Sequence, residues 1–304
     1  MSDTINDNTK QKDLKAFSRI ILQIVTELYK KVVPNCVKNR KNFDKRKLSD
    51  SEIIALAIIG ELLGMDSERC WYGFAKRNLS EVFGEFCDRT RYNRTKRALI
   101  HIIRDIQKET IKRLPASQIG IIDSFPLPVC KFGRAHFHKT FNGYGANYGY
   151  CPSKKEYYYG YKFHLIINEI GLPATFTITG ANIDDREVLE ELNEEAKFAI
   201  LIGDKGFIGA KSPGTKVIAL ERKNAKNPLY SKEQRQIIFK IRRRIETTIS
   251  QLTDTLNIQK VRAKSFWGLC ANIAFKILAF STAVLINKML GAENIFAIKN
   301  FIFY

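Results

Sequence analysis

The spacing of apolar residues changes once along the chain, near Gln118. Before it, apolar residues recur every three or four positions, as in amphipathic helices; 90–114 is the longest helix expected just before the change. After it, short apolar runs such as 119–124 and 198–203 have the length and β-branched content of buried strands. The sequence therefore predicts an all-helical region over 1–115, followed by a domain of strands and helices.

The order of the later elements constrains the fold further. The first strand is followed by a hairpin whose turn is 171–173, and then by a helix over about 184–195. Two further strands and two long helices complete the chain. The ribonuclease-H-like fold has this order: antiparallel strands come first, and a helix and parallel strands follow. We therefore expect a mixed α/β fold (an α+β mixed sheet) over 116–260, with a C-terminal helical extension over 261–304 packed on that domain.

Three acidic residues occupy positions that this fold would bring together. Asp123 ends the first strand, Asp204 follows the fourth, and Glu246 lies within a basic, helix-like stretch. A buried carboxylate is costly without a cation or metal, so Asp123 needs a positive partner. Carboxylate oxygens suit divalent ions, and a pair of such ions can cleave phosphodiesters. Taken singly, each acid also fits a turn or a solvated helical ion pair.

Composition narrows the class of partner. Lys and Arg number 50 against 31 Asp and Glu, a formal charge of +19 that fits a polyanion. The basic residues are spread along the chain, which argues against a membrane-surface helix and for no membrane partner. Six cysteines without CxxC spacing and a polar start favour a reducing cytoplasm. The most apolar segment, 271–287, is interrupted by Lys276 and is expected to be a buried helix.

Four blocks of the sequence carry a resemblance to a known family. They are 122–130 (IDSFPLPVC), 159–164 (YGYKFH), 203–209 (GDKGFIG) and 243–252 (RRIETTISQL). These blocks resemble the catalytic blocks of bacterial insertion-sequence DDE transposases, in the branch named after insertion sequence 982. The similarity extends over nearly the whole chain. Related transposases place the glutamate in a Tyr-x2-Arg-x3-Glu-x6-Lys pattern; here Phe239 and Thr253 replace the Tyr and the Lys.

The resemblance implies a specific chemistry. It implies that Asp123, Asp204 and Glu246 are the catalytic and metal-binding residues of a ribonuclease-H-like domain, with two Mg²⁺ ions, or Mn²⁺, as cofactor. The partner would be double-stranded DNA: the terminal inverted repeats of the element and the target. Hydrolysis would free 3′-OH groups that are then joined to target DNA. A homodimer or higher oligomer would hold the two ends, in the bacterial cytoplasm.

Eight basic residues are expected to contact DNA. In the helical region, a helix-turn-helix would place its recognition helix at the start of 90–114. Near the acids, basic residues would bind phosphates, and two later ones would replace the missing Lys of the pattern. The eight are Arg91, Arg94, Arg97, Lys162, Arg242, Arg243, Lys260 and Arg262. Each of them alone also fits an ordinary solvated surface.

Two segments leave alternatives open. The segment 131–161, rich in Gly, Tyr, Lys and His, is expected to form long connections whose rings either pack internally or stack on DNA. Asp184 and Asp185 are expected to cap the next helix, although Asp185 alternatively supports the acidic site. Two other functions also remain open. One is a ribonuclease-H-like nuclease or resolvase without strand transfer, and the other is a catalytically inactive DNA-binding remnant.

Overall fold

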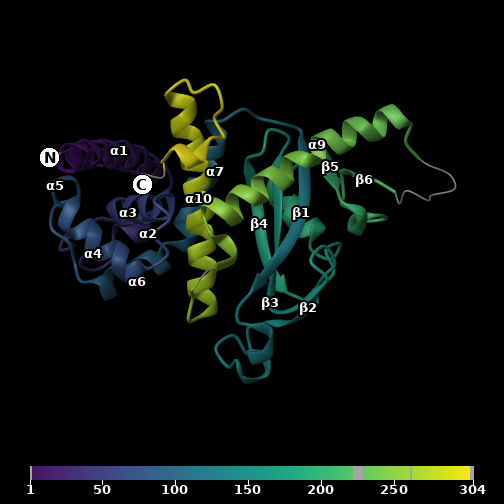
Figure 1. Cartoon of the computed structure of the whole chain (residues 1–304), viewed down its shortest axis with the longest axis horizontal. Helices are drawn as coiled ribbons and strands as arrows, with labels where there is room; N and C mark the ends of the chain where they lie inside the picture. The colour runs from purple at the N-terminus through teal and green to yellow at the C-terminus, as the bar shows by residue number, and fades with distance from the viewer. Residues whose placement is uncertain (1, 222–228, 261, 302–304) are drawn as a thin grey trace. The chain divides into compact units, whose positions relative to one another are not determined.

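The structure is a computed structural model that describes residues 2–221, 229–260 and 262–301 (Figure 1). The chain divides into two compact units. We call them the helical unit (Met1–Leu114, Asp254–Ala263 and Trp267–Tyr304) and the sheet unit (Pro115–Thr253 and Lys264–Phe266).

The N-terminal part of the helical unit is all-helical, as predicted. Its helices are α1 (Ser2–Val32), α2 (Asn35–Lys38), α3 (Asp50–Leu62), α4 (Glu68–Asn78), α5 (Ser80–Phe83), α6 (Arg89–Ala98) and α7 (Ile100–Lys112). Short helical turns follow later in the chain: η4 (Ile258–Lys260) and η5 (Ile298–Phe301). A capping box is present at the start of α3, where the Ser49 hydroxyl accepts from the backbone N–H of Glu52 and the Glu52 carboxylate accepts from the backbone N–H of Ser49.

The prediction of one long helix over 90–114 is wrong, because the structure has two helices there, α6 and α7. The break is at Leu99, which ends α6 with φ −85° and ψ 4°. Leu99 is buried, as are Tyr92 in α6 and Ile103 in α7. The three- and four-residue apolar spacing runs through the break without interruption, so periodicity alone could not reveal it. The sequence around Leu99 contains no Gly or Pro that would mark the break.

Helix α10 (Phe266–Met289) is apolar on all sides, and most of it is buried. Within the helical unit, Gln107 Nε2 donates to Ser281 Oγ at 2.7 Å, and Lys276 Nζ donates to the Leu256 carbonyl at 2.7 Å. By length and hydropathy α10 could cross a membrane, but 89% of its most apolar window is buried in the structure, the pattern of a core helix. Residues 261–304 are expected from the sequence on the catalytic domain, whereas Trp267–Tyr304 group with the helical unit. A helix that is apolar on all sides needs neighbours all round.

The sheet unit has a mixed, curled sheet. Its strands are β1 (Ile119–Pro128), β2 (Asn147–Cys151), β3 (Glu156–Asn168), β4 (Pro173–Gly180), β5 (Ile200–Gly203) and β6 (Lys216–Ala219). The order is β2-β3-β1-β5-β6, with β4 also paired to β3. The pairs β1–β3, β3–β4 and β2–β3 are antiparallel, while β1–β5 and β5–β6 are parallel. This mixed α/β arrangement after a helical region confirms the predicted fold class and is consistent with a ribonuclease-H-like domain.

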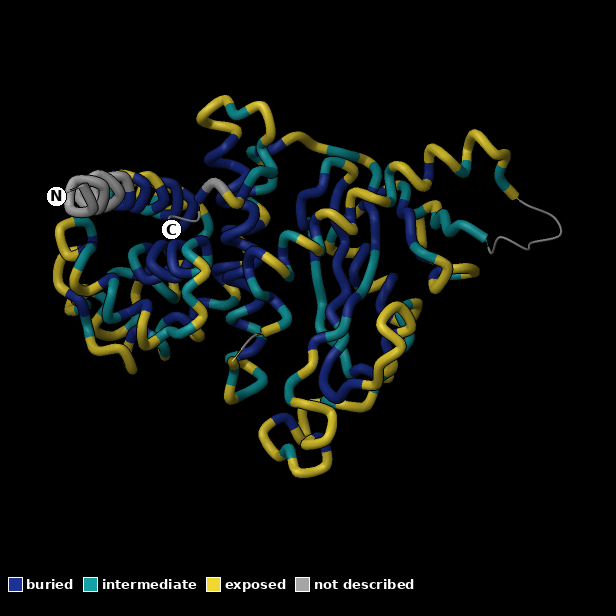
Figure 2. The backbone as a smooth tube through the Cα atoms, in the orientation of Figure 1, coloured by how far each residue is buried: buried dark blue, intermediate teal, exposed yellow. Residues whose placement is uncertain are grey.

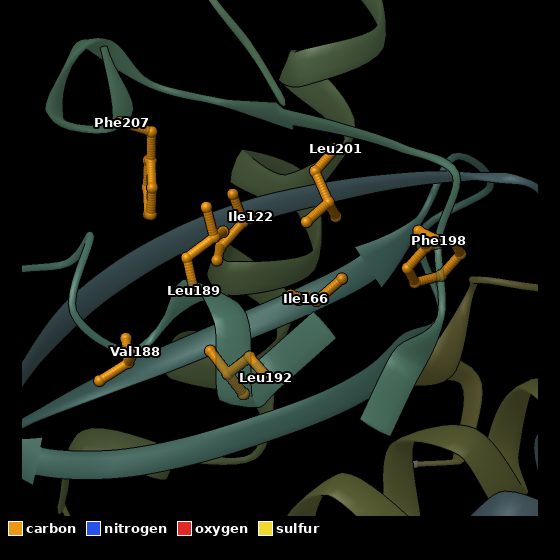
Figure 3. Close-up of a cluster of buried hydrophobic side chains, with 8 residues drawn as sticks. All are labelled: Ile122, Ile166, Val188, Leu189, Leu192, Phe198, Leu201 and Phe207. Atoms are coloured by element: carbon orange, nitrogen blue, oxygen red, sulfur yellow. The ribbon is translucent and has the colours of Figure 1, made fainter. Parts of the chain in front are cut away.

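Two longer helices and three short turns complete the sheet unit. They are α8 (Leu189–Ala196), α9 (Lys232–Ser250), the 3-10 turns η1 (Phe132–Phe137) and η2 (Lys205–Phe207), and a π turn, η3 (Gln251–Thr255), at the end of α9. Ile122 and Ile166 pack against Leu189 and Leu192 of α8 (Figure 3). Successive strand residues point to opposite faces, so Asp123 faces away from α8, towards α9, which runs across β1 and β5 in Figure 1. The central strands between these helices are mostly buried (Figure 2).

The expectation of long connections over 131–161 is wrong. This segment contains η1 and β2, and β3 begins within it at Glu156. Tyrosine is favoured in strands, and here tyrosines of β2 and β3 face one another in register, for example Tyr150 and Tyr157. The glycines and lysines between the rings obscured that alternation in the sequence.

Candidate active site

Asp123 lies where the pairing of β1 with β5 stops. The last paired residues there are Ile121 and Ile202, two positions before Asp123, whereas pairing with β3 continues past it. Its Oδ1 accepts a 2.8 Å hydrogen bond from the Ser124 backbone N–H. Burial raises the pKa of Asp123 to about 6, and the negative charges of Asp204 and Asp185 add to that rise, against the Ser124 N–H and Arg242. The carboxylate is therefore largely buried, and its nearest cation, Arg242, is only loosely paired with it at 3.9 Å, which makes it receptive to a further cation.

Asp204 follows β5, on the strand beside β1. Its Oδ1 accepts a 2.7 Å hydrogen bond from the Gly206 backbone N–H, which fixes the turn of η2. A Cβ at Gly206 would lie 2.9 Å from Asp204 Oδ1 and 3.7 Å from Asp185 Oδ2. Both carboxylates therefore border one small space, which the missing side chain of Gly206 leaves open.

Glu246 comes to the site from α9, one turn after Arg242. Arg242 Nη1 lies 3.7 Å from Glu246 Oε1, and its Nη2 lies 3.9 Å from Asp123 Oδ2. The Nε of Arg242 is buried and has no hydrogen-bond partner among the described residues. The Glu246 side chain is half-exposed. One guanidinium thus lies between an acid of the sheet and an acid of the helix, paired closely with neither.

Asp184 and Asp185 do not cap α8, so that prediction is wrong. The helix starts only at Leu189, and Val188 at its N-cap makes no side-chain bond. Asp184 instead accepts from the Arg186 backbone at 2.9 Å and pairs with its guanidinium at 2.8 Å. Asp185 turns towards the sheet. Residues 184–188 form a turn before the helix, which the amphipathic pattern did not separate from the helix itself.

Asp185 belongs to a buried polar group beneath β3. Its Oδ1 lies 3.2 Å from Lys162 Nζ and 3.4 Å from His164 Nδ1. His164 is fully buried, with Nε2 2.8 Å from Thr179 Oγ1. Burial lowers the pKa of His164 to about 4, so the ring is neutral at neutral pH. Lys162 also donates to the Ile183 carbonyl at 2.8 Å, so its ammonium is turned to protein partners rather than outwards.

The other residues expected to contact DNA are mostly exposed. Arg243 is exposed on α9, with its guanidinium 5.7 Å from the Phe239 ring centroid. Five more are exposed in the helical unit: Arg91, Arg94, Arg97, Lys260 and Arg262. Lys96, between them on α6, is buried, with Nζ 5.0 Å from the Phe275 ring centroid. Exposure leaves those six available to a polyanion, and their contacts with DNA stay a prediction.

The donor set at the site is made of carboxylate oxygens only. Asp204 and Asp185 lie near Gly206, Asp123 and Glu246 lie near Arg242, and oxygen donors suit Mg²⁺ or Mn²⁺ better than Zn²⁺. Over residues 2–221, 229–260 and 262–301, no three His, Cys, Asp or Glu side chains are close enough to form a metal site as they stand. The residues therefore fit a divalent ion in chemistry, and holding one requires the carboxylates to draw together.

Comparison with known proteins supplies the family. A family model described as "Transposase DDE domain" matches residues 113–266, which is 154 of the 304 residues. The chain belongs to the DDE transposase family. The matched span contains Asp123, Asp204 and Glu246, and transposases of this family act on DNA, generally with divalent metal ions. No curated protein and no solved structure matches the chain.

Proposed function

We propose that this transposase binds the terminal inverted repeats of an insertion sequence, hydrolyses phosphodiester bonds at the element ends and joins the freed 3′-OH groups to target DNA. The observation that carries the proposal is the position of Asp123. It is largely buried beside the end of β5, 3.9 Å from Arg242 of α9, which also lies 3.7 Å from Glu246, and it is inside the matched domain. The charge of +19 supports a DNA partner.

We propose that Asp123, Asp204 and Glu246 hold two Mg²⁺ ions, or Mn²⁺, with Asp185 supporting Asp204 from the far side of Gly206. Bound there, the ions would supply an activated water and stabilise the leaving 3′ oxygen. Asp123 gains most from a nearby cation, because its burial disfavours the charged carboxylate. Lys162 and His164 lie 3.2 and 3.4 Å from Asp185 Oδ1 without hydrogen-bonding to it, and Oδ2 is on the Gly206 side.

Arg242 provides the positive charge between Asp123 and Glu246 in the structure, at distances of 3.7 to 3.9 Å that are loose for an ion pair. When the carboxylates take up a metal, we propose that this guanidinium turns to a DNA phosphate. Arg243, next to it and exposed, would contact the same backbone.

We further propose that residues 1–115 recognise the inverted repeats through the exposed arginines of α6, and that 116–260 carries the chemistry. Synapsis of two ends requires a homodimer or larger assembly on DNA, in the bacterial cytoplasm. Membership of the branch named after insertion sequence 982 rests on the four sequence blocks.

Strand transfer separates the proposed function from simpler ones. The assay supplies an oligonucleotide ending in a pre-cut inverted repeat, a supercoiled plasmid and Mg²⁺, and looks for the oligonucleotide joined to the plasmid. A matched oligonucleotide ending in a 3′-dideoxynucleotide has no attacking hydroxyl and should give no product. Cleavage of uncut ends without joining would favour the nuclease or resolvase alternative. Binding with neither cleavage nor joining would favour an inactive remnant.

A further inference from the structure

One face of the β2–β3 hairpin is made of aromatic rings. Tyr148 pairs with Tyr159 and Tyr150 pairs with Tyr157, so these four side chains point to the same side of the two strands. The ring centroids are 5.1 Å apart in the first pair and 4.9 Å apart in the second. Phe132 of η1 extends the row, 6.0 Å from Tyr148 and 6.2 Å from Tyr157. We call these five residues the aromatic face.

The aromatic face is not the side of the hairpin that packs on the sheet unit. The opposite side performs that role: Tyr158 is buried with Cys151 and Ala181, and a Cβ at Gly149 would lie 2.8 Å from the Ala181 Cβ. Tyr159 alone of the five is buried. The other four expose between 47% (Tyr148) and 66% (Tyr157) of their surface. Contiguous exposed rings of this kind mark an interaction surface.

The charges around these rings select the partner. Over 131–161 the exposed charged residues are five basic ones and a single acid, Glu156. The basic ones are Lys131, Arg134, Lys139, Lys154 and Lys155. The loops that carry them lie at the hairpin end of the sheet in Figure 1, and are largely exposed in Figure 2. Basic residues beside exposed aromatic rings suit a single-stranded nucleic acid, whose phosphates are negative and whose unstacked bases can contact the rings. The same positive charge would repel a second copy of this surface.

We propose that the aromatic face binds unpaired DNA bases, stacking them on Tyr148, Tyr150 and Tyr157, while the surrounding lysines contact phosphates. Duplex DNA hides its base faces, so the occupant is single-stranded DNA, such as a strand opened at an element end. Every base has a flat face that can stack on a ring, so this binding should depend little on the DNA sequence. The inference rests on the proposed function for its biological setting, but its test is independent of catalysis.

The test is binding of a fluorescently labelled single-stranded oligonucleotide and of the matching blunt duplex, by fluorescence anisotropy. The full chain is used in EDTA, so no cleavage occurs. Tyr148→Ala and Tyr157→Ala should each weaken single-strand binding about tenfold. Both should leave duplex binding within about twofold, because duplex bases cannot stack there. Tyr157→Phe keeps the ring and should bind like the wild type.

Salt dependence separates stacking from phosphate contact. The two alanine variants should keep the slope of log affinity against log salt, since they remove no charge. Lys154→Ala and Lys155→Ala should each reduce that slope by about 0.7 for single strands. Circular dichroism of each variant verifies that the fold is retained.

Several results would overturn the inference. One is unchanged single-strand affinity in the folded alanine variants, and another is an equal loss for single strand and duplex. Tyr157→Phe behaving like Tyr157→Ala would replace stacking by a hydroxyl contact. A change in sedimentation of Tyr157→Ala without DNA would make the face an interface between copies of the chain. Failure of the proposed function would look different: cleavage and joining would be absent while this binding remained.

Discussion

The burial of Asp123 makes the stability of the sheet unit depend on pH in an unusual direction. Its pKa rises from 3.8 to about 6 on folding. Between these values the folded protein keeps a proton that the unfolded chain has lost, so the free energy of unfolding falls as pH rises through this window. Above pH 6 the carboxylate is charged in both states, and the full free-energy cost of burying that charge lowers the stability of the folded protein. The rise corresponds to about 3 kcal/mol, and the partial exposure of the side chain reduces it, so we expect about 1–3 kcal/mol.

Asp123→Asn removes this cost without removing the hydrogen bond from the Ser124 N–H, because the amide oxygen accepts it equally. In EDTA, the variant should be about 1–3 kcal/mol more stable than the wild type at pH 7.5, and nearly equal to it at pH 4. Urea unfolding followed by circular dichroism measures the difference, and hydrogen exchange in β1 locates it in the sheet unit. Saturating Mg²⁺ should then stabilise the wild type more than the variant and narrow the gap.

Asp184→Asn is the matched control, since it makes the same change at an exposed carboxylate. The Arg186 side chain and backbone hold the pKa of Asp184 down at about 2, so its contribution has the opposite sign and is lost as pH falls. A gap between Asp123→Asn and the wild type that is the same at pH 4 and pH 7.5 would refute the reasoning. So would a variant that is less stable than the wild type at pH 7.5.

Three further predictions test other parts of the structure. Asp185→Asn should weaken Mn²⁺ binding in calorimetry by about tenfold or more, whereas Asp184→Asn should leave it unchanged; equal effects would exclude Asp185 from the site. Gly160→Ala should abolish folding of the sheet unit or lower its stability by several kcal/mol in urea unfolding, because φ is +152° and the added Cβ would lie 2.3 Å from the Leu127 carbonyl oxygen. Ser49→Ala should cost about 1 kcal/mol in thermal unfolding through loss of the cap of α3; no change would mean that the cap contributes nothing.

The sequence was sufficient for those parts of the fold that local patterns determine. The apolar runs at 119–124 and 198–203 became β1 and β5, and the order of strands and helices led to the mixed sheet. The break at Leu99 and the strand β2 were both missed. The apolar spacing continues through Leu99, and the pairing of β2 with β3 across a hairpin is not visible in the glycine-rich composition of 131–161.

For the candidate site, the sequence predicted the acids but not their surroundings. Asp123 and Asp204 follow apolar runs, a visible signal, and strand order then places them on adjacent strands. Asp184 and Asp185 were both expected as helix caps, because both precede an amphipathic run, and only Asp185 had the alternative of supporting the acidic site. Only the folded chain shows that one pairs with Arg186 while the other turns to His164. Nothing in the sequence indicated that Lys162 contacts the Ile183 carbonyl and Asp185, because those contacts depend on where the loop that carries both residues lies.

The most direct test of the account is Mg²⁺-dependent cleavage of DNA that carries the flanking inverted repeats. The wild type is compared with Asp123→Asn, Asp204→Asn and Glu246→Gln, and DNA binding is measured alongside. We predict cleavage at the repeat ends by the wild type, loss of cleavage in all three variants, and binding retained in each. Cleavage that survives any one substitution would contradict the assignment of that acid, with Asp185 the next to test. A wild type that binds the repeats in Mg²⁺ without cutting them would contradict the proposed function itself.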